Sequence, residues 1–415
     1  MNSYDLSLWI YNLALVPIVF FSILFMLLTF MNFLEKKEKK PYRKLAEVPF
    51  VTVQIPTYND PVSERCVKKC LEFDYPKDKY EIIIADDSTN QETRQKLGAF
   101  AKKYPRLVKY THRDSRDNFK PGALNNALKY TKGEIIVLFD ADWIPGRCFL
   151  KKIIAPFADE KVAIVQSRQG FYNQNTNIVT RFASYLLMVH HTIVLPLSNR
   201  INCVFFCGTA GAVRKSALLK VGGWNVNSIT EDSDLTVNLL MQGYKSVYLD
   251  FETPSEVPNT IEGFIKQQMR WCYGNMRVFI ENASRIFGKR GLSLKQRLMI
   301  LYITLGNLIA PIVVVMTFFG FAGWFLGDLK MFTFKDFANL LFTFTLTSGF
   351  LLMGLFVLYK RKQLKSFPYL IASTMSIGIV LSAANTVAIV RAMLNKKLGW
   401  FCTPKVANDK FVSDS

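Results

Sequence analysis

Residues 134–142 read Glu-Ile-Ile-Val-Leu-Phe-Asp-Ala-Asp, a short apolar run that ends in two acidic residues. A run without polar alternation is typical of a strand buried on both faces, as in a parallel sheet. Ligands of such sheets bind beyond the carboxyl ends of the strands. Asp140 and Asp142 therefore suit a divalent cation that also takes diphosphate oxygens. The alternative interpretation of this pair is a solvated loop or helix cap.

Similar runs lie on either side of this stretch. Residues 51–55 end at Pro56, residues 80–85 run into Asp86-Asp87, and residues 162–166 follow along the chain. Because helical patterns separate these runs, residues 47–290 predict one water-soluble α/β domain with a mostly parallel sheet. Asp87 is either a polar contact for a nucleotide base or ribose, or part of a turn that caps a helix.

Apolar segments flank this domain. Residues 6–34 contain no charged side chain and are followed by a lysine-rich run, which predicts a membrane anchor with a cytoplasmic C-terminal end. Beyond residue 298, the uncharged stretches 299–327, 337–359 and 366–390 predict transmembrane and interfacial helices over 298–392. Residues 393–415 are then a cytoplasmic tail.

The third stretch raises a topological conflict. Three full spans after a cytoplasmic domain would place the tail outside the cell, whereas Lys396 and Lys397 favour the inside. We therefore expect residues 366–390 to be re-entrant or partly interfacial, or one of the other two stretches to be so. Ala383-Ala384-Asn385 is a plausible weak point.

The charge pattern favours a membrane protein over a nucleic-acid-binding protein. The chain carries 52 Lys and Arg against 32 Asp and Glu, a net charge of +20, with a mean hydropathy of +0.15. Basic runs flank the apolar segments, as expected for contact with anionic membrane lipid. This segregation argues against a plain soluble enzyme and against a disordered polybasic chain.

Two motifs in the domain suit a nucleotide. Pro56-Thr57-Tyr58-Asn59 ends the first run, and the ring of Tyr58 could face a base. Residues 120–125 read as a loop leading into a helix, and Lys120 beside a helix N-terminus suits a phosphate. A simple basic turn is the alternative for Lys120.

Two later motifs suit proton transfer and diphosphate binding. Thr230-Glu231-Asp232 is either an ordinary helix start or the position of a carboxylate base, Asp232. Gln267, Arg270 and Trp271 lie on one face of a predicted helix, where Arg270 offers a planar donor fork and Trp271 a flat face for a sugar. The alternative is a core tryptophan beside a surface arginine.

The order of these motifs, bracketed by apolar segments, resembles the processive, membrane-embedded inverting glycosyltransferases of family 2, which include cellulose, hyaluronan and chitin synthases. The resemblance covers residues 47–290 closely and the flanking helices loosely. It is strongest to the cellulose-synthase-like branch associated with glucan and mannan synthesis. The motifs that carry it are Pro56-Thr57-Tyr58-Asn59, Ala85-Asp86-Asp87-Ser88-Thr89, Lys120-Pro121-Gly122-Ala123-Leu124, Phe139-Asp140-Ala141-Asp142, Val165-Gln166-Ser167-Arg168, Cys207-Gly208-Thr209-Ala210-Gly211 and Gly222-Gly223-Trp224.

The resemblance implies a GT-A-like, nucleotide-sugar-binding sheet and assigns roles to individual residues. The residues implied to bind the nucleotide sugar are Thr57, Tyr58, Asp87, Lys120, Asp140, Gln267 and Arg270. Asp140 and Asp142 would flank the diphosphate with Mg²⁺ or Mn²⁺, and Asp232 would be the general base. The residues implied to bind the acceptor are Cys207, Gly208, Thr209 and Trp271.

The implied reaction is a single displacement that moves a hexose from a nucleotide sugar, with UDP-glucose and GDP-mannose favoured, onto a growing β-linked polysaccharide. Export would proceed through the protein's own membrane helices, with the catalytic domain on the cytoplasmic side of the cell membrane. The sequence leaves an accessory subunit open. Near the C-terminus, Thr403 and Lys405 resemble the gating-loop motif of cellulose synthases, with a frayed basic tail as the alternative.

Two other functions remain open at this point. One is transfer of a single sugar to a membrane lipid, since ceramide glucosyltransferase also carries a version of the Gln-x-x-Arg-Trp motif. The other is a membrane receptor or transport protein with a degenerate nucleotide-binding domain. The presence of both Asp142 and Asp232 argues against the second.

Overall fold

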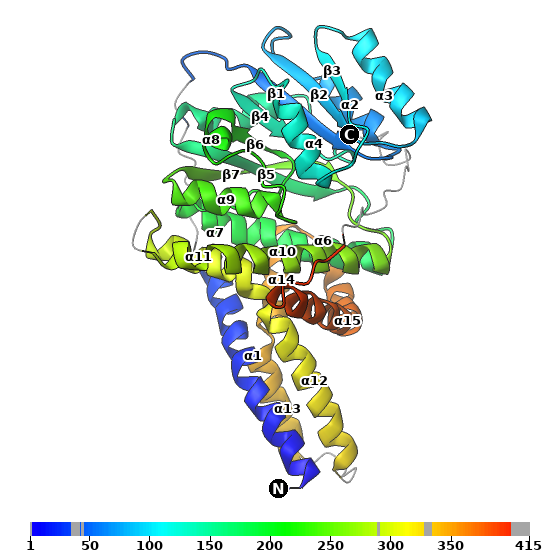
Figure 1. The fold of residues 1–415 in the computed structure, drawn as a ribbon. Helices are drawn as coiled ribbons and strands as arrows, with labels where there is room; N and C mark the ends of the chain where they lie inside the picture. The colour runs from blue at the N-terminus through cyan, green and yellow to red at the C-terminus, as the bar shows by residue number, and fades with distance from the viewer. Residues whose placement is uncertain (1, 35–41, 43–44, 289–290, 328–333, 400–415) are drawn as a thin grey trace.

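The structure is a computed structural model that describes residues 2–34, 42, 45–288, 291–327 and 334–399. Its described part consists of an α/β body and a set of long apolar helices that extend from one side of that body (Figure 1). The predicted gating residues Thr403 and Lys405 lie outside the described residues.

The described residues of the α/β body form a seven-stranded sheet in the order β3-β2-β1-β4-β6-β5-β7. The strands are β1 (Val51–Thr57), β2 (Tyr80–Asp86), β3 (Val108–His112), β4 (Ile135–Leu138), β5 (Val162–Phe171), β6 (Gly211–Arg214) and β7 (Lys245–Ser255). All neighbours pair in parallel except β6, which is antiparallel to both β4 and β5. The predicted mostly parallel sheet is therefore confirmed, and the four predicted apolar runs are β1, β2, β4 and β5.

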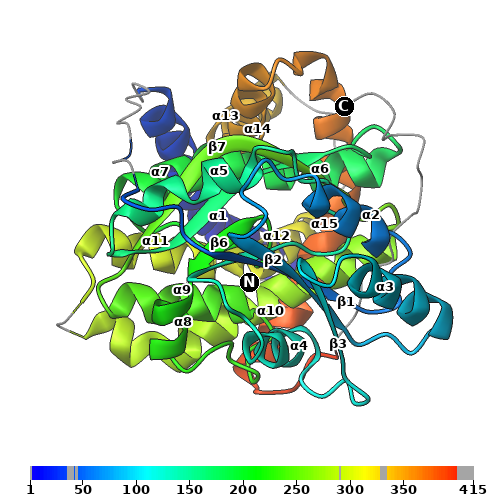
Figure 2. The same cartoon turned by 90° about the horizontal axis from the view of Figure 1, so that it is seen from above.

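Helices cover both faces of the sheet, as the view from above shows (Figure 2). One face packs against α2 (Ser63–Leu71) and α5 (Phe149–Ile153) around fully buried side chains such as Val53 and Val137. The other face packs against α4 (Phe119–Leu128), α8 (Lys215–Lys220) and α9 (Glu231–Met241) around residues such as Ile136. Burial on both faces explains why β4 and residues 82–85 of β2 are continuously apolar.

One local prediction is wrong, because Lys120 and the residues after it are helical rather than a loop. Asn118 has a left-handed backbone with φ of 59°, and α4 begins at the next residue. Pro121 lies in the first turn of α4, where its missing N–H removes no helical hydrogen bond. Lys120 itself therefore lies in the first turn of a helix.

Long helical segments of the described chain extend away from the sheet (Figure 1). They are α1 (Ser3–Phe33), α12 (Ile309–Leu326) and the pair α13 (Phe334–Thr347) and α14 (Gly349–Lys360), which is bent by 58°. The backbone N–H of Gly349 donates to Ser22 Oγ at 2.8 Å, so α1 and α14 meet at the bend. By length and composition, Ser3–Phe33, Ile178–Arg200, Leu294–Leu326 and Leu364–Met393 could each cross a membrane, and the bent pair could form one more span.

The last described helix, α15 (Phe367–Met393), lies against the α/β body from end to end (Figure 1). Near its start, Tyr185 Oη on α6 (Ile178–Val189) donates to the Ser366 carbonyl at 3.4 Å. Near its end, Arg277 on α10 (Ile261–Phe287) donates to the Ala392 carbonyl at 3.3 Å. Contact with the α/β body at both ends is what we expect of an interfacial helix. The interfacial location itself stays a prediction.

The expected weak point in this segment is absent. The helix runs unbroken through Ala383-Ala384-Asn385, where the sequence suggested an interruption. Asn385 is buried, and its carbonyl accepts a contact from Cys272 Sγ on α10 at 3.7 Å. The asparagine therefore packs against a neighbouring helix instead of ending its own.

Candidate active site

Asp140 and the segment before β6 meet at one edge of the sheet. Asp140 follows β4, so it lies at the carboxyl edge of the parallel strands. Because β6 runs antiparallel to β4, the residues that precede β6 arrive at this same edge. The backbone N–H of Asp140 donates to Thr209 Oγ1 at 2.9 Å. The structure thus brings the predicted donor-binding and acceptor-binding segments together.

Lys120 is the centre of this cluster. Its Nζ lies 2.7 Å from Asp140 Oδ1, 3.0 Å from the Gly208 carbonyl and 3.9 Å from Glu231 Oε1. Burial lowers the pKa of the Lys120 ammonium, but the carboxylates of Asp140 and Glu231 outweigh burial and hold the pKa above its usual value. Lys120 therefore stays charged at neutral pH and can attract a phosphate.

Asp232 lies on the other side of Gly208. The backbone N–H of Ser233 donates to Asp232 Oδ1 at 2.7 Å, which fixes the carboxylate at the start of α9. Gly208 has φ of +72°, and a Cβ added to it would lie 2.7 Å from Asp232 Oδ2. Burial raises the pKa of the Asp232 carboxyl, and the cations of Lys120 and Arg270 partly offset the rise. A carboxylate of raised basicity in a buried site suits a general base.

Glu231 is a site residue that the sequence reasoning did not select. Its side chain is buried, and burial raises its pKa to about 7, with Lys120 opposing the rise. Glu231 therefore titrates near neutral pH beside Asp232. Its place beside Asp232 in the motif Thr230-Glu231-Asp232 was the available signal.

The helix that was predicted for Gln267, Arg270 and Trp271 is confirmed as part of α10. Arg270 lowers the pKa of both Glu231 and Asp232 through its charge, so its guanidinium is close enough to act on the same site. Gly274, one turn further along α10, allows close contact with α9, since a Cβ there would lie 2.3 Å from Thr230 Cγ2. The three predicted side chains are all partly exposed.

At the end of β2, Asp87 is held by an arginine that sequence reasoning missed. Arg113 donates through Nε to Asp87 Oδ1 at 2.7 Å and through Nη2 to Oδ2. A second missed residue, Arg116, lies over the ring of Tyr58 with its guanidinium carbon 3.4 Å from the ring centroid. Both arginines follow β3, a strand that the sequence did not predict, so their approach could not be anticipated.

Thr57 and Asp142 complete the edge of the sheet. Thr57 ends β1 and is buried, and its Oγ1 has no hydrogen-bond partner among the described residues. Asp142 is 2% exposed, and its Oδ2 accepts from the Glu256 backbone N–H at 3.0 Å. Among the described residues, no group of three or more His, Cys, Asp or Glu side chains converges as a metal site. Binding of Mg²⁺ or Mn²⁺ by Asp140 and Asp142 stays a prediction, and an ion held by this pair would need further oxygens, such as those of a diphosphate.

Cys207 completes the acceptor-side motif. Its thiol lies 4.0 Å from His190 Nε2, and its backbone N–H donates to Gln166 Oε1 at 2.9 Å. Gln166 belongs to the Val165-Gln166-Ser167-Arg168 motif, and its amide nitrogen also donates to the Thr209 carbonyl at 3.0 Å. The side chain of Gln166 thus holds the segment from Cys207 to Thr209 in place.

Comparison with known proteins gives one family match and several relatives. Residues 135–360 match the family described as Glycosyl transferase family group 2. Two relatives from Oryza sativa subsp. japonica, "Probable glucomannan 4-beta-mannosyltransferase 7" and "Probable glucomannan 4-beta-mannosyltransferase 4", are both 33% identical to the chain, over 280 and 271 residues. The matches cover 64% and 63% of this chain and 48% and 49% of the relatives, so the chain spans about half their length.

One solved structure matches nearly the whole chain. It is described as "Mannosyltransferase PcManGT from Pyrobaculum calidifontis in complex with GDP-Man and Mn2+". The match has a TM-score of 0.67 at 21% identity and covers 94% of this chain and 99% of that chain. At this identity the likeness shows a shared fold, which agrees with the predicted GT-A-like sheet flanked by apolar helices.

Proposed function

Because the chain belongs to the glycosyl transferase family group 2, we propose that it is an inverting hexosyltransferase that extends a β-linked polysaccharide from a nucleotide sugar. The observation that carries the proposal is the position of Gly208. Its carbonyl accepts from Lys120, which is paired with Asp140, and its α-carbon faces the carboxylate of Asp232. A phosphate-binding cation and a candidate base thus lie on either side of one glycine.

The chemistry follows from these positions. Asp232 takes the proton of an acceptor hydroxyl while that oxygen bonds to the anomeric carbon of an α-linked sugar. The bond from that carbon to the diphosphate breaks, and the nucleoside diphosphate leaves with the electron pair. Lys120, Arg270 and Gln267 bind the leaving diphosphate, whose negative charge grows in the transition state. Displacement from the opposite face gives a β-glycosidic bond.

The donor is held at the carboxyl ends of β1, β2 and β4. Thr57, Tyr58 and Asp87 bind the base and ribose in this proposal, and the unpaired Thr57 Oγ1 supports it. A Mg²⁺ or Mn²⁺ ion bound by Asp140 and Asp142 would act as a Lewis acid on the diphosphate. GDP-mannose is the first donor to test, because the two rice relatives are described as mannosyltransferases, and UDP-glucose is the second.

The acceptor enters from the side of α10. Trp271 stacks under its terminal sugar, and the segment Cys207-Gly208-Thr209 lines its path in this proposal. In this proposal the enzyme lies in the cell membrane, with the α/β body in the cytoplasm and the polymer leaving between the helices. The apolar helices that are long enough to cross a membrane support it. A gating role for Thr403 and Lys405, which lie outside the described residues, requires α15 to be interfacial rather than a full span.

A second candidate is transfer of one sugar to a membrane lipid. The observation that favours it is that at most five segments of the described residues are long and apolar enough to cross a membrane. Few helices leave little room to enclose a polymer. The size of the product separates the two candidates.

The test is a donor screen on the purified full chain in lipid. Release of nucleoside diphosphate is followed with GDP-mannose, UDP-glucose and UDP-N-acetylglucosamine, with Mg²⁺, with Mn²⁺ and with a chelator, and the labelled product is sized. Asp232→Asn should abolish turnover, whereas Asp234→Asn, two residues along α9, should retain it because Asp234 bonds to Asn225 and Asn238. Equal activity of Asp232→Asn and wild type would overturn the assignment of the base, and a single-sugar lipid product would establish the second candidate.

A further inference from the structure

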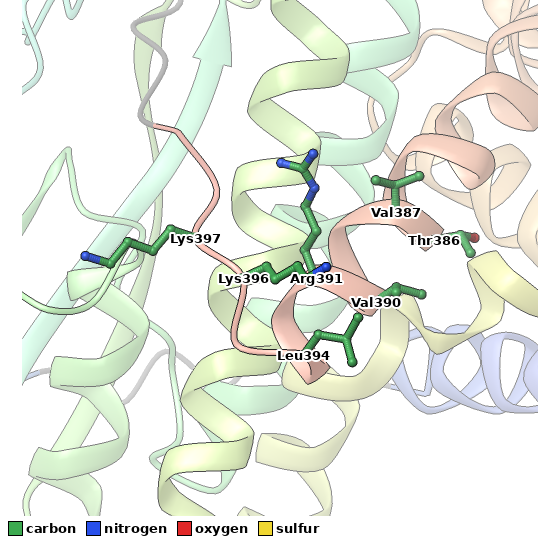
Figure 3. Close-up of a pocket in the computed structure, with 7 residues that line it drawn as sticks. All are labelled: Thr386, Val387, Val390, Arg391, Leu394, Lys396 and Lys397. Atoms are coloured by element: carbon green, nitrogen blue, oxygen red, sulfur yellow. The ribbon is translucent and has the colours of Figure 1, made fainter.

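A groove of about 550 Å³ lies at the C-terminal end of α15 (Figure 3). The residues that line it are Thr386, Val387, Val390, Arg391, Leu394, Lys396 and Lys397. The proposed reaction uses none of them. The groove also differs from the active site in composition, because none of the described residues that line it carries a carboxylate.

The lining has an apolar part and a cationic part. Val387, Val390 and Leu394 are between 47% and 60% exposed, so three aliphatic side chains at the end of α15 and just beyond it face outwards. Arg391, Lys396 and Lys397 form no ion pair with any described residue. Three cations without a counter-ion repel one another, so an anion in the groove would be attracted by all three.

The groove lies where the α/β body meets the apolar helices. Its helix α15 packs against α10 through the buried residues Ala388 and Ala392, and against Leu305 and Leu308 just before α12. The segment Leu294–Leu326, which contains α12, could cross a membrane by length and composition. The apolar residues of the groove lie next to its basic residues, where the α/β body meets the apolar helices. This arrangement matches a phospholipid, whose acyl chains lie next to its phosphate.

We propose that this groove binds the phosphate of an anionic membrane phospholipid, with an acyl chain along Val387, Val390 and Leu394. Arg391 supplies a planar donor fork for the phosphate, and Lys396 and Lys397 add charge. A free phosphate would leave the apolar residues in contact with water, so the exposed aliphatic side chains favour the lipid. The site is independent of the proposed reaction.

The experiment measures lipid selectivity on the full chain reconstituted in phosphatidylcholine. Spin-labelled phosphatidylglycerol and spin-labelled phosphatidylcholine are compared, and the ratio of their association constants is determined by electron paramagnetic resonance. The variant Arg391→Gln/Lys396→Gln/Lys397→Gln should lower this ratio by about fivefold for each charge that contacts the lipid phosphate. The charge-preserving variant Arg391→Lys/Lys396→Arg/Lys397→Arg should keep most of the selectivity.

The matched control removes three exposed lysines outside the groove, as Lys295→Gln/Lys362→Gln/Lys365→Gln. Lys295 lies in α11 (Leu294–Leu305), and Lys362 and Lys365 lie just before the opposite end of α15. This variant has the same net charge as the groove variant, so selectivity should stay close to wild type. An equal loss in both variants would show general surface attraction and overturn the site, as would unchanged selectivity in the groove variant. Loss of selectivity on addition of inorganic phosphate at constant ionic strength would show that the groove binds free phosphate instead.

Discussion

Gly208 offers the sharpest test of the active-site geometry, because its substitution by alanine moves a single atom towards the proposed base. The added Cβ would lie 2.7 Å from Asp232 Oδ2, about 0.7 Å inside ordinary van der Waals contact. Since the Gly208 carbonyl is fixed by Lys120, the carboxylate has to move rather than the backbone. A displacement approaching 1 Å at a reacting group costs about 100-fold in rate, which is about 2.7 kcal/mol in the barrier.

A matched glycine separates this clash from backbone strain. Gly243 has φ of +81°, close to the +72° of Gly208, but a Cβ there meets nothing within 4 Å. Both alanine variants should therefore lose about 1–2 kcal/mol of stability for the left-handed backbone, while only Gly208→Ala should lose turnover.

The assay is nucleoside diphosphate release at saturating donor, with the melting temperature of each variant measured in the same detergent. Gly208→Ala should lower kcat by about 100-fold and leave the KM for the donor nearly unchanged, because the phosphate contacts of Lys120 remain. If Gly208→Ala and Gly243→Ala have the same kcat, Asp232 does not act as the base from its position beside Gly208.

Three further predictions use the same preparation. Lys120→Gln removes a cation that lowers the pKa of Asp232, so the acidic limb of the kcat/KM profile should move to higher pH; an unmoved limb would contradict this electrostatic coupling. Glu231→Gln should become more stable than wild type as the pH rises from 4.5 to about 7. Because the pKa of Glu231 is raised in the folded protein, wild type loses folding stability over this pH range, whereas the neutral glutamine does not titrate. Melting temperatures of both proteins across this range test the prediction. Gly274→Ala should cost about 1–3 kcal/mol of stability, because the added Cβ overpacks against Thr230. In α3 (Gln91–Lys103), a Cβ at Gly98 meets nothing within 4 Å, so Gly98→Ala should be neutral or stabilising by about 0.5–1 kcal/mol. Chemical denaturation of both variants compares the two effects.

The central strands could be predicted because burial dictates their sequence. β1, β2 and β4 lie between two layers of helices, so almost every residue in them is buried. Their apolar runs, such as residues 82–85 and 135–138, follow from that burial. β3 has only Val108 fully buried, and β6 is four residues long beside glycine and small residues. Neither strand therefore has a periodic pattern of apolar residues by which the sequence could have predicted it.

The candidate site was predictable where a motif occupies one segment and unpredictable where the fold brings segments together. Arg113 reaches Asp87 across 26 residues, and its partner depends on the register between β2 and β3. The contact of Lys120 with the Gly208 carbonyl spans 88 residues and depends on β6 running antiparallel. Lys120 itself was placed in a loop because Pro121 and Gly122 commonly interrupt a helix, whereas here they occupy its first turns.

The antiparallel insertion of β6 also divides the protein's specificity between two parts of the chain. The strand ends that face the nucleotide in our proposal all come before residue 143, whereas the segment before β6, the base on α9 and the tryptophan on α10 all come after residue 200. A chimera joined at the start of β5 would therefore inherit its nucleotide preference from one parent and its acceptor preference from the other. Recombination between relatives at this point could change the polymer while keeping the activated sugar that supplies it.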